Sequence, residues 1–402
     1  MSVDRGQSPF CPGQPVPVDL FVGRAAQIDR IVVRGVRQVS AGKSYCVYVQ
    51  GEYGIGKSSI ARFVQIGAEH RFGLLGIYAM LSGATTLDDV GAAILDATVR
   101  AGAYNPRASE KIQDWLAKWV GEQSLFGLTI HADALRKEGP KVAGGILPFL
   151  REALGRVRDA GIRGIFLILD EINGISSKPE FAHFIKGLVD GNALDREPIP
   201  LLLMLCGVEE RRREMIRNHQ PIDRVFDVVD IGKMTKAEME EFFQKAFSSV
   251  RMEVEPRAMD LLTRYSAGFP KIMHLVGDAA FWLDTDGVVD LRDAVKAVTE
   301  AADEFGRRYV DQQVYAALKS EAYRSILGKI GSAALEGDAT IRRADISAEL
   351  APAERGKLDN FLRKMRQLKV LRPGSVQGEY VFAVRMVALY IWLRSQEPET
   401  RT

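Results

Sequence analysis

The first part of the 402-residue chain alternates short apolar runs with amphipathic segments. Two runs, at 164–169 and 201–206, are continuous and apolar, which is typical of strands buried on both faces of a parallel sheet. Short runs of β type at 45–50 and 76–80 predict two more strands, and residues 125–130 predict a further strand in an excursion between core elements. Apolar residues at helical spacing predict helices over 25–39, 58–68, 86–101, 112–120 and 146–160. This alternation predicts an α/β domain with a parallel sheet.

The pattern changes after residue 231, where the strand-like runs stop. Helical periodicity covers 236–247, 257–265, 270–282 and 291–304, which predicts a helical subdomain. Further helices are predicted at 314–330, 343–350 and 354–368, followed by a hairpin of 370–372 and 380–384 that turns at Pro373-Gly374-Ser375. Three helices and a two-stranded wing describe a winged helix. The predicted parts are an extended leader (1–19), a core (20–232), the helical subdomain (233–305) and the winged helix (306–402).

Composition narrows the classes of protein. The 54 Lys and Arg residues balance 52 Asp and Glu, so the net charge of +2 excludes a strongly polybasic or polyanionic chain. Three widely spaced cysteines form no CxxC motif, which indicates a reducing compartment. No apolar run reaches the length of a membrane helix, and the Pro-rich start lacks the apolar core of a secretory signal. These features predict a soluble cytoplasmic protein without a membrane partner.

A phosphate-binding motif follows the first predicted strand. Residues 51–58 read Gly-Glu-Tyr-Gly-Ile-Gly-Lys-Ser, a full GxxxxGK[ST] match between a predicted strand and a predicted helix. Its glycines let backbone N–H groups turn towards phosphate oxygens, Lys57 reaches the β- and γ-phosphates, and Ser58 ligates Mg²⁺. The residues expected to contact the nucleotide here are Gly51, Tyr53, Gly54, Ile55, Gly56, Lys57, Ser58 and Ser59.

Two carboxylates end the third predicted strand of the core. Ile165-Phe166-Leu167-Ile168-Leu169-Asp170-Glu171 is an apolar run that finishes in Asp-Glu. Such a run is common by itself, but after a phosphate-binding loop it is the expected partner. Asp170 is predicted to hold Mg²⁺ through water, and Glu171 is predicted to orient and deprotonate the attacking water.

These motifs, with two others, resemble those of origin-recognition-type AAA+ proteins and STAND signalling ATPases. Phe21-Val22-Gly23-Arg24 is similar to the FxGR box of this group, and Phe10–Val16 is similar to the leader ahead of it. Gly268-Phe269-Pro270-Lys271 resembles the GxP or sensor-2 box. The resemblance implies an α/β fold with a P-loop parallel-sheet ATPase core, a helical lid and a C-terminal winged-helix domain. It implies ATP and Mg²⁺ as cofactors.

The resemblance also implies roles for single residues. Val22 and Gly23 would lie against adenine, and Arg24 would fix that linker. Pro270 would pack on the base, or Lys271 would point at the phosphates. Arg224 occupies a place like that of the arginine finger, which acts on a neighbouring subunit's nucleotide; a surface ion pair is the alternative. The sequence departs from the group after the fourth strand, where Cys206, Gly207 or Glu209 replaces a polar sensor residue, which favours slow turnover.

The winged-helix region carries an excess of positive charge. Residues 306–402 hold 17 Lys and Arg against 11 Asp and Glu. One face of the helix at 354–368 carries Lys357, Asn360, Arg363 and Lys364, and Arg372 lies on the wing. In a helix-turn-helix protein this helix would enter the major groove of double-stranded DNA. Winged helices also serve as protein-docking or regulatory modules.

Two functions follow from these features. The first is an ATP-dependent AAA+ switch, a homo-oligomer in the ATP state, whose winged helix binds DNA. The second is a STAND-like signalling or defence ATPase whose winged helix is a latch or a docking module for a partner protein. The missing polar sensor favours a slow switch, and the basic helix favours DNA.

Overall fold

The computed structural model describes the chain except residues 1–5, 15, 103–104, 121–144, 337–339 and 397–402. The strand predicted at 125–130 lies outside the described residues. The chain forms two compact units, residues 23–232 and residues 1–22 together with 233–402.

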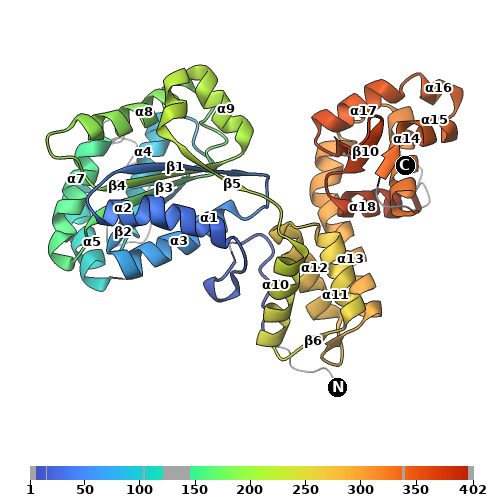
Figure 1. Ribbon diagram of the computed structural model, residues 1–402, viewed down its shortest axis with the longest axis horizontal. Helices are drawn as coiled ribbons and strands as arrows, with labels where there is room; N and C mark the ends of the chain where they lie inside the picture. Colours follow the sequence, from blue (N-terminus) through green and yellow to red (C-terminus); the bar gives the residue numbers. More distant parts are fainter. Residues whose placement is uncertain (1–5, 15, 103–104, 121–144, 337–339, 397–402) are drawn as a thin grey trace. The chain divides into compact units, whose positions relative to one another are not determined.

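The unit formed by residues 23–232 is built on a parallel five-stranded sheet in the order β2-β3-β4-β1-β5 (Figure 1). Its strands are β1 (Tyr45–Gly51), β2 (Leu74–Met80), β3 (Gly164–Asp170), β4 (Leu201–Gly207) and β5 (Asp227–Ile231). The four strands predicted from apolar runs are confirmed, and every residue of β3 and β4 is buried. β5 was not predicted because its five residues include two aspartates and lie at the sheet edge.

Helices cover both faces of this sheet. One face carries α3 and the segment that precedes β1, and the other carries α4, α5, α7, α8 and α9. Their bounds are α1 (Ala25–Ile31), α2 (Arg37–Ser40), α3 (Lys57–Phe72), α4 (Leu87–Val99), α5 (Pro106–Val120), α7 (Ile146–Val157), α8 (Pro179–Leu194) and α9 (Glu209–Asn218). The helix predicted at 25–39 contains a π-helical stretch, Val32–Val36, where Gly35 meets Leu202 of β4.

The contact between α3 and β2 depends on a glycine. A Cβ at Gly76 would lie 2.0 Å from Glu69 Oε1 and 2.4 Å from Gln65 Nε2 of α3. The absent side chain therefore lets two polar side chains of the helix lie directly on the strand. Burial raises the pKa of Glu69 to about 7, although hydrogen bonding from Gln65 opposes the shift.

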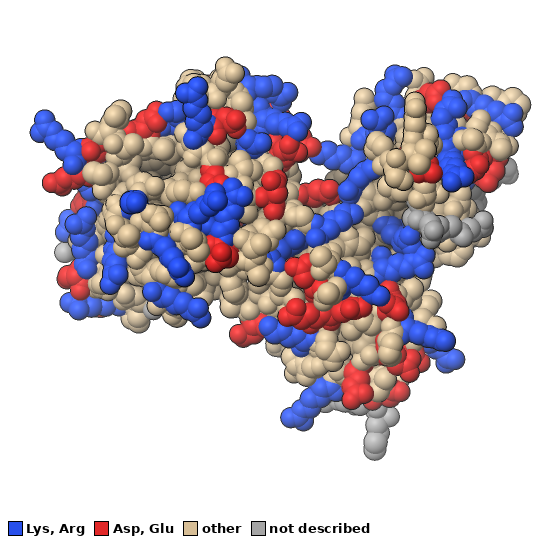
Figure 2. Space-filling model, viewed as in Figure 1, with Lys and Arg blue, Asp and Glu red and all other residues tan. Residues whose placement is uncertain are grey.

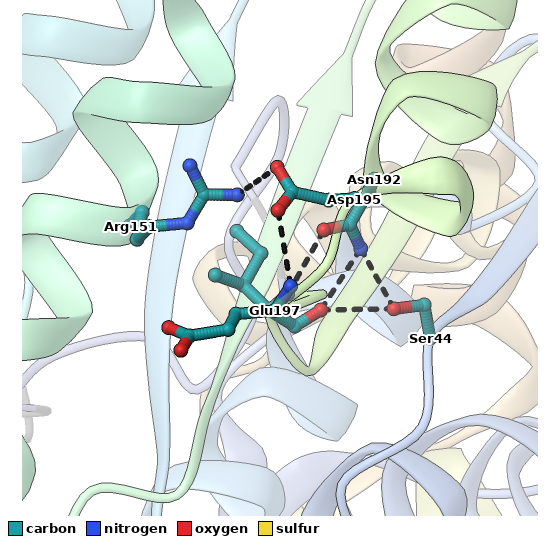
Figure 3. Close-up of polar contacts among 6 residues, drawn as sticks. Ser44, Arg151, Asn192, Asp195 and Glu197 are labelled. Carbon is teal, nitrogen blue, oxygen red and sulfur yellow. Dashed lines mark hydrogen bonds and ion pairs between the residues drawn. The ribbon is translucent and has the colours of Figure 1, made fainter.

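A buried asparagine fixes the connection from α8 to β4 (Figure 3). The Asn192 amide donates to Ser44 Oγ (2.8 Å) and to the Ile199 carbonyl (2.9 Å), and it accepts the Ile199 N–H (2.9 Å). Asp195 binds Arg151 of α7 and accepts the Glu197 N–H at 3.1 Å. The bonds of Asn192 join the segments that lead into β1 and β4, so they align these two neighbouring strands.

The other unit contains the helical subdomain and the N-terminal leader. Its helices are α10 (Lys236–Ser249), α11 (Pro256–Ser266), α12 (Pro270–Leu283) and α13 (Leu291–Phe305), with a small sheet of β6 (Glu253–Val254) and β7 (Val288–Val289). The leader packs on these helices: Phe10 is buried over Gly277, with its ring 4.9 Å from that of Phe247. The Cys11 N–H donates to His274 Nδ1 at 3.0 Å, and burial lowers the pKa of His274 to about 4.

The same unit ends in a winged-helix arrangement. Its elements are η5 (Gly306–Tyr315, π-helical), α14 (Glu321–Glu336), β8 (Thr340–Arg342), α15 (Arg343–Glu349), α16 (Pro352–Arg355), α17 (Leu358–Gln367), β9 (Leu371–Pro373), β10 (Glu379–Phe382) and α18 (Arg385–Gln396). The three strands pair antiparallel in the order β8-β10-β9. The sequence did not predict β8 or α18.

Two helices predicted in this region were wrong in extent. The helix expected at 314–330 is interrupted between Tyr315 and Glu321. The helix expected at 354–368 is split at Gly356. Glycine disfavours a helix more than any other residue type except proline. Buried Glu354 of the short α16 binds Lys329 of α14 at 2.7 Å, which holds α16 in place separately from α17.

Of the helices that the structure describes, none is both long and apolar enough to span a bilayer.

Replacement of Asn192 tests the α8–β4 connection. Asn192→Ala removes three hydrogen bonds and leaves the buried N–H of Ile199 unpaired, while the Ile199 carbonyl still accepts the Ser44 hydroxyl, so we expect a loss of about 1–3 kcal/mol of local stability. Hydrogen exchange of the β1 and β4 amides measures this without assuming that both units unfold in one step. Asn218→Ala, which removes one exposed bond to the Ser177 carbonyl, is the matched control. Equal protection in both variants would contradict the role of Asn192.

Glu69 gives a prediction about pH. Its pKa is higher in the folded chain than its ordinary value of 4.5, so the stabilising contribution is complete below about pH 4.5 and is lost as pH rises through about 7. Glu69→Gln stays neutral, so its stability relative to the wild type should increase by about 1–3 kcal/mol over that range. Denaturant unfolding at several pH values measures the difference. Glu180→Gln, at an exposed position, is the control, and a pH-independent difference for Glu69→Gln would refute the prediction.

Candidate functional site

The phosphate-binding motif forms a tight loop between β1 and α3. Gly54 and Gly56 have positive φ values of 76° and 100°, which favour glycine. A Cβ at Gly51 would lie 2.6 Å from the Ile231 carbonyl of β5, so only glycine fits at the end of β1. The loop leads directly into the first turn of α3, whose N–H groups and dipole favour an anion. The Ile55 side chain is buried, so its backbone is the part that can face a ligand.

Lys57 lies at the first position of α3 with its ammonium against the loop. Nζ donates to the carbonyls of Gly51 (3.1 Å) and Glu52 (2.9 Å). Burial lowers the pKa of Lys57, and the nearby acidic groups of Cys206, Glu171 and Asp170 act in the opposite direction. The positive charge is therefore held among the loop carbonyls and beside the carboxylates of β3. Tyr53 is 61% exposed, and Ser58 and Ser59 are half-buried.

The two carboxylates that end β3 differ in their surroundings. Asp170 is 1% exposed, and its Oδ1 accepts the Glu171 N–H at 2.8 Å while its Oδ2 accepts the Tyr78 hydroxyl. Glu171 is half-buried, with φ of 56°, and its Oε2 accepts the Asn173 amide at 2.8 Å. The left-handed backbone at Glu171 turns its side chain out of the strand. Sequence reasoning missed Asn173 and Tyr78, since neither belongs to a motif.

β4 lies between β1 and β3, and it places Cys206 at the centre of the site. Burial raises the pKa of the Cys206 thiol far above its usual range, Asp170 adds to the rise, and Lys57 opposes it. Of the three residues considered for the polar sensor, Glu209 binds Arg213 in α9, and a Cβ at Gly207 would lie 2.4 Å from the Tyr48 hydroxyl oxygen. Cys206 is thus the β4 side chain beside Lys57 and Asp170.

The FxGR box contacts the phosphate loop through its arginine. Arg24 precedes α1 with φ of 63°, is buried, and donates from a guanidinium nitrogen to the Ile55 carbonyl at 3.2 Å. Gly23 also has a positive φ, and Val22 is buried. The structure therefore links the box that resembles an adenine-binding linker to the loop that resembles a phosphate site.

Pro270, Lys271 and Arg224 are the other residues predicted for the ATP site. Pro270 and Lys271 open α12 in the other unit, where Lys271 Nζ lies 4.1 Å from the centroid of the Tyr309 ring. Arg224 is exposed in the 3₁₀ segment Gln220–Val225 and forms no ion pair with a residue that the structure describes. Its neighbour Asp223 binds Arg212 instead, at 2.7 Å. The ion pair considered as an alternative for Arg224 is therefore not seen within the described chain.

The basic residues predicted to contact DNA lie around α17 and β9. Lys357, Asn360 and Arg363 are exposed, and Lys364 is half-buried. Figure 2 shows one face of the molecule, with Lys and Arg in blue and Asp and Glu in red. Arg372 donates to the Ala383 carbonyl at 3.2 Å. Leu358, Phe361, Leu362 and Met365 of α17 are buried, so the polar face of the helix is turned away from the winged-helix core.

The site has ligands suited to a hard cation. No cluster of three or more His, Cys, Asp and Glu side chains that could hold a metal occurs in the described part of the chain. Mg²⁺ needs fewer protein ligands, since it keeps several waters and binds through one or two protein oxygens together with substrate phosphates. The Ser58 hydroxyl and the Asp170 carboxylate, which accepts the Tyr78 hydroxyl, supply that kind of donor set.

Comparison with known proteins shows the fold. No family model and no curated protein matches the sequence. The solved ORC2 protein of Aeropyrum pernix, in ADPNP and ADP complexes, has a TM-score of 0.59 at 15% identity, covering 97% of this chain and 95% of that chain. The Walker-type ATPase paby2304 of Pyrococcus abyssi also has a TM-score of 0.59, at 16% identity, covering 92% and 96%. The chain has the fold of an origin-recognition-type P-loop ATPase.

Proposed function

We propose that the chain is an ATP-binding, slowly hydrolysing molecular switch of the AAA+ type. In this proposal the nucleotide controls oligomerisation and the engagement of DNA by the winged helix. The observation that carries it is the convergence of the glycine loop, Lys57 and the Asp170–Glu171 pair at one end of the sheet. A metabolic kinase would have no use for the helical subdomain and winged helix that accompany this site.

Each group of the site has a role in this proposal. The loop N–H groups and Lys57 bind the phosphates, and Arg24 holds the linker against which adenine lies. Ser58 and Asp170 would hold Mg²⁺, which neutralises phosphate charge when bound. Glu171, turned out of β3 and oriented by Asn173, takes a proton from the attacking water.

Slow turnover follows from the chemistry of Cys206. A thiol is a weak hydrogen-bond donor, so it contributes little to fixing a water molecule or a γ-phosphate. Its burial also keeps it neutral, so it adds no charge to the site. Cys206 does not weaken nucleotide binding, because nucleotide binding depends on the loop and Lys57.

Contacts with the γ-phosphate can supply the free-energy difference that shifts the switch between its two states. A shift from 1:99 to 99:1 between two states needs about 5.5 kcal/mol of differential binding. Charged contacts to Lys57, to Lys271 and to Arg224 of a neighbouring copy are of the kind that supplies such a difference. Lys271 would exchange its contact with Tyr309 for the phosphate, a cation–π interaction worth about 0.5–2 kcal/mol.

A second function is favoured by the packing of the winged helix on the helical subdomain. Helix α18 contacts α11 and α13 of the helical subdomain, and Lys233 Nζ donates to the Ala383 carbonyl at 3.1 Å. Such close packing suits a latch or a docking module for a partner protein. In that case the nucleotide site works as proposed, but the winged helix does not bind DNA.

Two substitutions test the nucleotide site. Lys57→Ala should abolish ATP binding, because it removes the charge that the loop holds for the phosphates. Glu171→Gln should keep ATP binding but slow hydrolysis by about 10²–10⁴-fold, because an amide takes no proton from water. Equilibrium binding of labelled ATP and phosphate release measure the two effects. Glu180→Gln, an exposed change of the same kind, serves as the control. Wild-type hydrolysis by Glu171→Gln would show that Glu171 is not the base.

DNA binding is tested with the Glu171→Gln protein, which accumulates the ATP state. Fluorescence anisotropy of labelled duplex should show tight binding with ATP that weakens with salt. Reversal of Arg363 and Lys364 to Glu should reduce the salt slope by about 1 for each phosphate that the protein no longer neutralises. Reversal of the exposed Lys245 and Arg257, on the helical subdomain, changes the net charge equally and serves as the control.

The control decides between the two functions. Equal weakening in both double variants would mean that net charge alone attracts the duplex. No binding in either nucleotide state would favour the latch or docking module, and the search would turn to a protein partner. Light scattering of the same samples with ATP and ADP tests the proposed homo-oligomer.

A further inference from the structure

Tyr78 is a candidate-site residue that no sequence motif marks. It lies near the end of β2, whose register with β3 pairs Tyr78 with Ile168 and Met80 with Asp170. Tyr78 and Asp170 therefore project from the same face of the sheet, since alternate residues of paired parallel strands share a face. Gly76, on this face as well, lies against Gln65 and Glu69 of α3. The phenol thus extends between the sheet and the helix that begins with the phosphate loop.

Tyr78 is hydrogen-bonded to the predicted cation ligand Asp170. Its hydroxyl donates to Asp170 Oδ2, while Oδ1 of the same carboxylate accepts the Glu171 N–H. Each oxygen of the carboxylate therefore accepts one hydrogen bond, one from β2 and one from the backbone that follows β3.

These bonds have a consequence for cation binding. The phenol holds one oxygen of a nearly fully buried carboxylate and the Glu171 N–H holds the other, which fixes the orientation of the whole group. Asp170 is then arranged before a cation arrives.

We infer that Tyr78 is a positioning residue that arranges Asp170 for the divalent cation bound with the nucleotide. The inference rests on the proposed function, because the cation reaches this site as a complex with nucleotide phosphates. Tyr78 itself touches neither the cation nor the nucleotide in this role. Removal of partners that orient metal ligands typically lowers metal affinity or activity by about 10–100-fold. We expect an effect of that size on the cation-dependent part of nucleotide binding alone.

The test separates the cation from the nucleotide. Binding of mant-ATP is measured by fluorescence in MgCl₂ and in EDTA, and the ratio of the two dissociation constants gives the effect of Mg²⁺. Tyr78→Phe, which removes only the phenol oxygen, should reduce this ratio by about 10-fold or more and leave the EDTA constant unchanged. Tyr48→Phe is the matched control, since Tyr48 is buried in β1 and its hydroxyl donates to the Val208 carbonyl at 3.2 Å.

Other outcomes overturn the inference. An unchanged ratio in Tyr78→Phe would show that the phenol does not act on the cation site, and a larger ratio would show that it competes with the cation. Tyr78→His keeps a hydrogen-bond donor and should recover part of the ratio. Equal reduction in Phe and His would assign the effect to packing. Thermal unfolding of Tyr78→Phe without ligand confirms that the variant folds. The same measurement with mant-ATP, in MgCl₂ and in EDTA, gives the ratio of the two dissociation constants independently.

The proposed function has a separate outcome in the same experiment. If the wild type binds mant-ATP in neither buffer, the ATP switch itself is wrong and the role of Tyr78 falls with it. If the wild type binds and all three tyrosine variants behave alike, the ATP site stands and only the role of Tyr78 is refuted.

Discussion

A buried carboxylate such as Asp170 has to be matched by donors and positive charge, because transfer of an unpaired ion out of water is very costly. The fold meets this requirement from three directions: the next backbone N–H, the Tyr78 phenol of β2, and the nearby charge of Lys57 at the start of α3. These groups come from neighbouring strands and the phosphate loop. The register of the sheet and the position of α3 are therefore coupled to the chemistry of one carboxylate.

The same coupling explains why part of the site follows from the sequence and part does not. The four predicted strands and the phosphate loop are local features, a continuous apolar run or a motif of eight residues, so the sequence shows them directly. Tyr78 is 92 residues from Asp170 along the chain, and Arg24 is 31 residues from Ile55, so their contacts exist only after the strands pair. Edge strand β5 and wing strand β8 were missed because short, mixed sequences carry little periodic signal.

Because Cys206 replaces a polar sensor, the group contributed by β4 differs in chemistry from the other groups of the site. The groups that hold phosphate are charged or backbone donors fixed by the loop, whereas the group contributed by β4 is a buried thiol. Under the proposed function, such a site would favour retention of a nucleotide over rapid turnover. That would suit a switch, because the lifetime of the bound state decides how long a signal or an assembly persists.

The division of the chain into units also restricts how they can move. Residues 23–232 are inserted between two segments of the other unit, so the backbone passes between the units twice, at Val22–Gly23 and at Gly232–Lys233. The residues expected to lie against adenine form the first of these crossings. In the proposed switch, a bound base would therefore limit the backbone freedom of one of the two connections between the units.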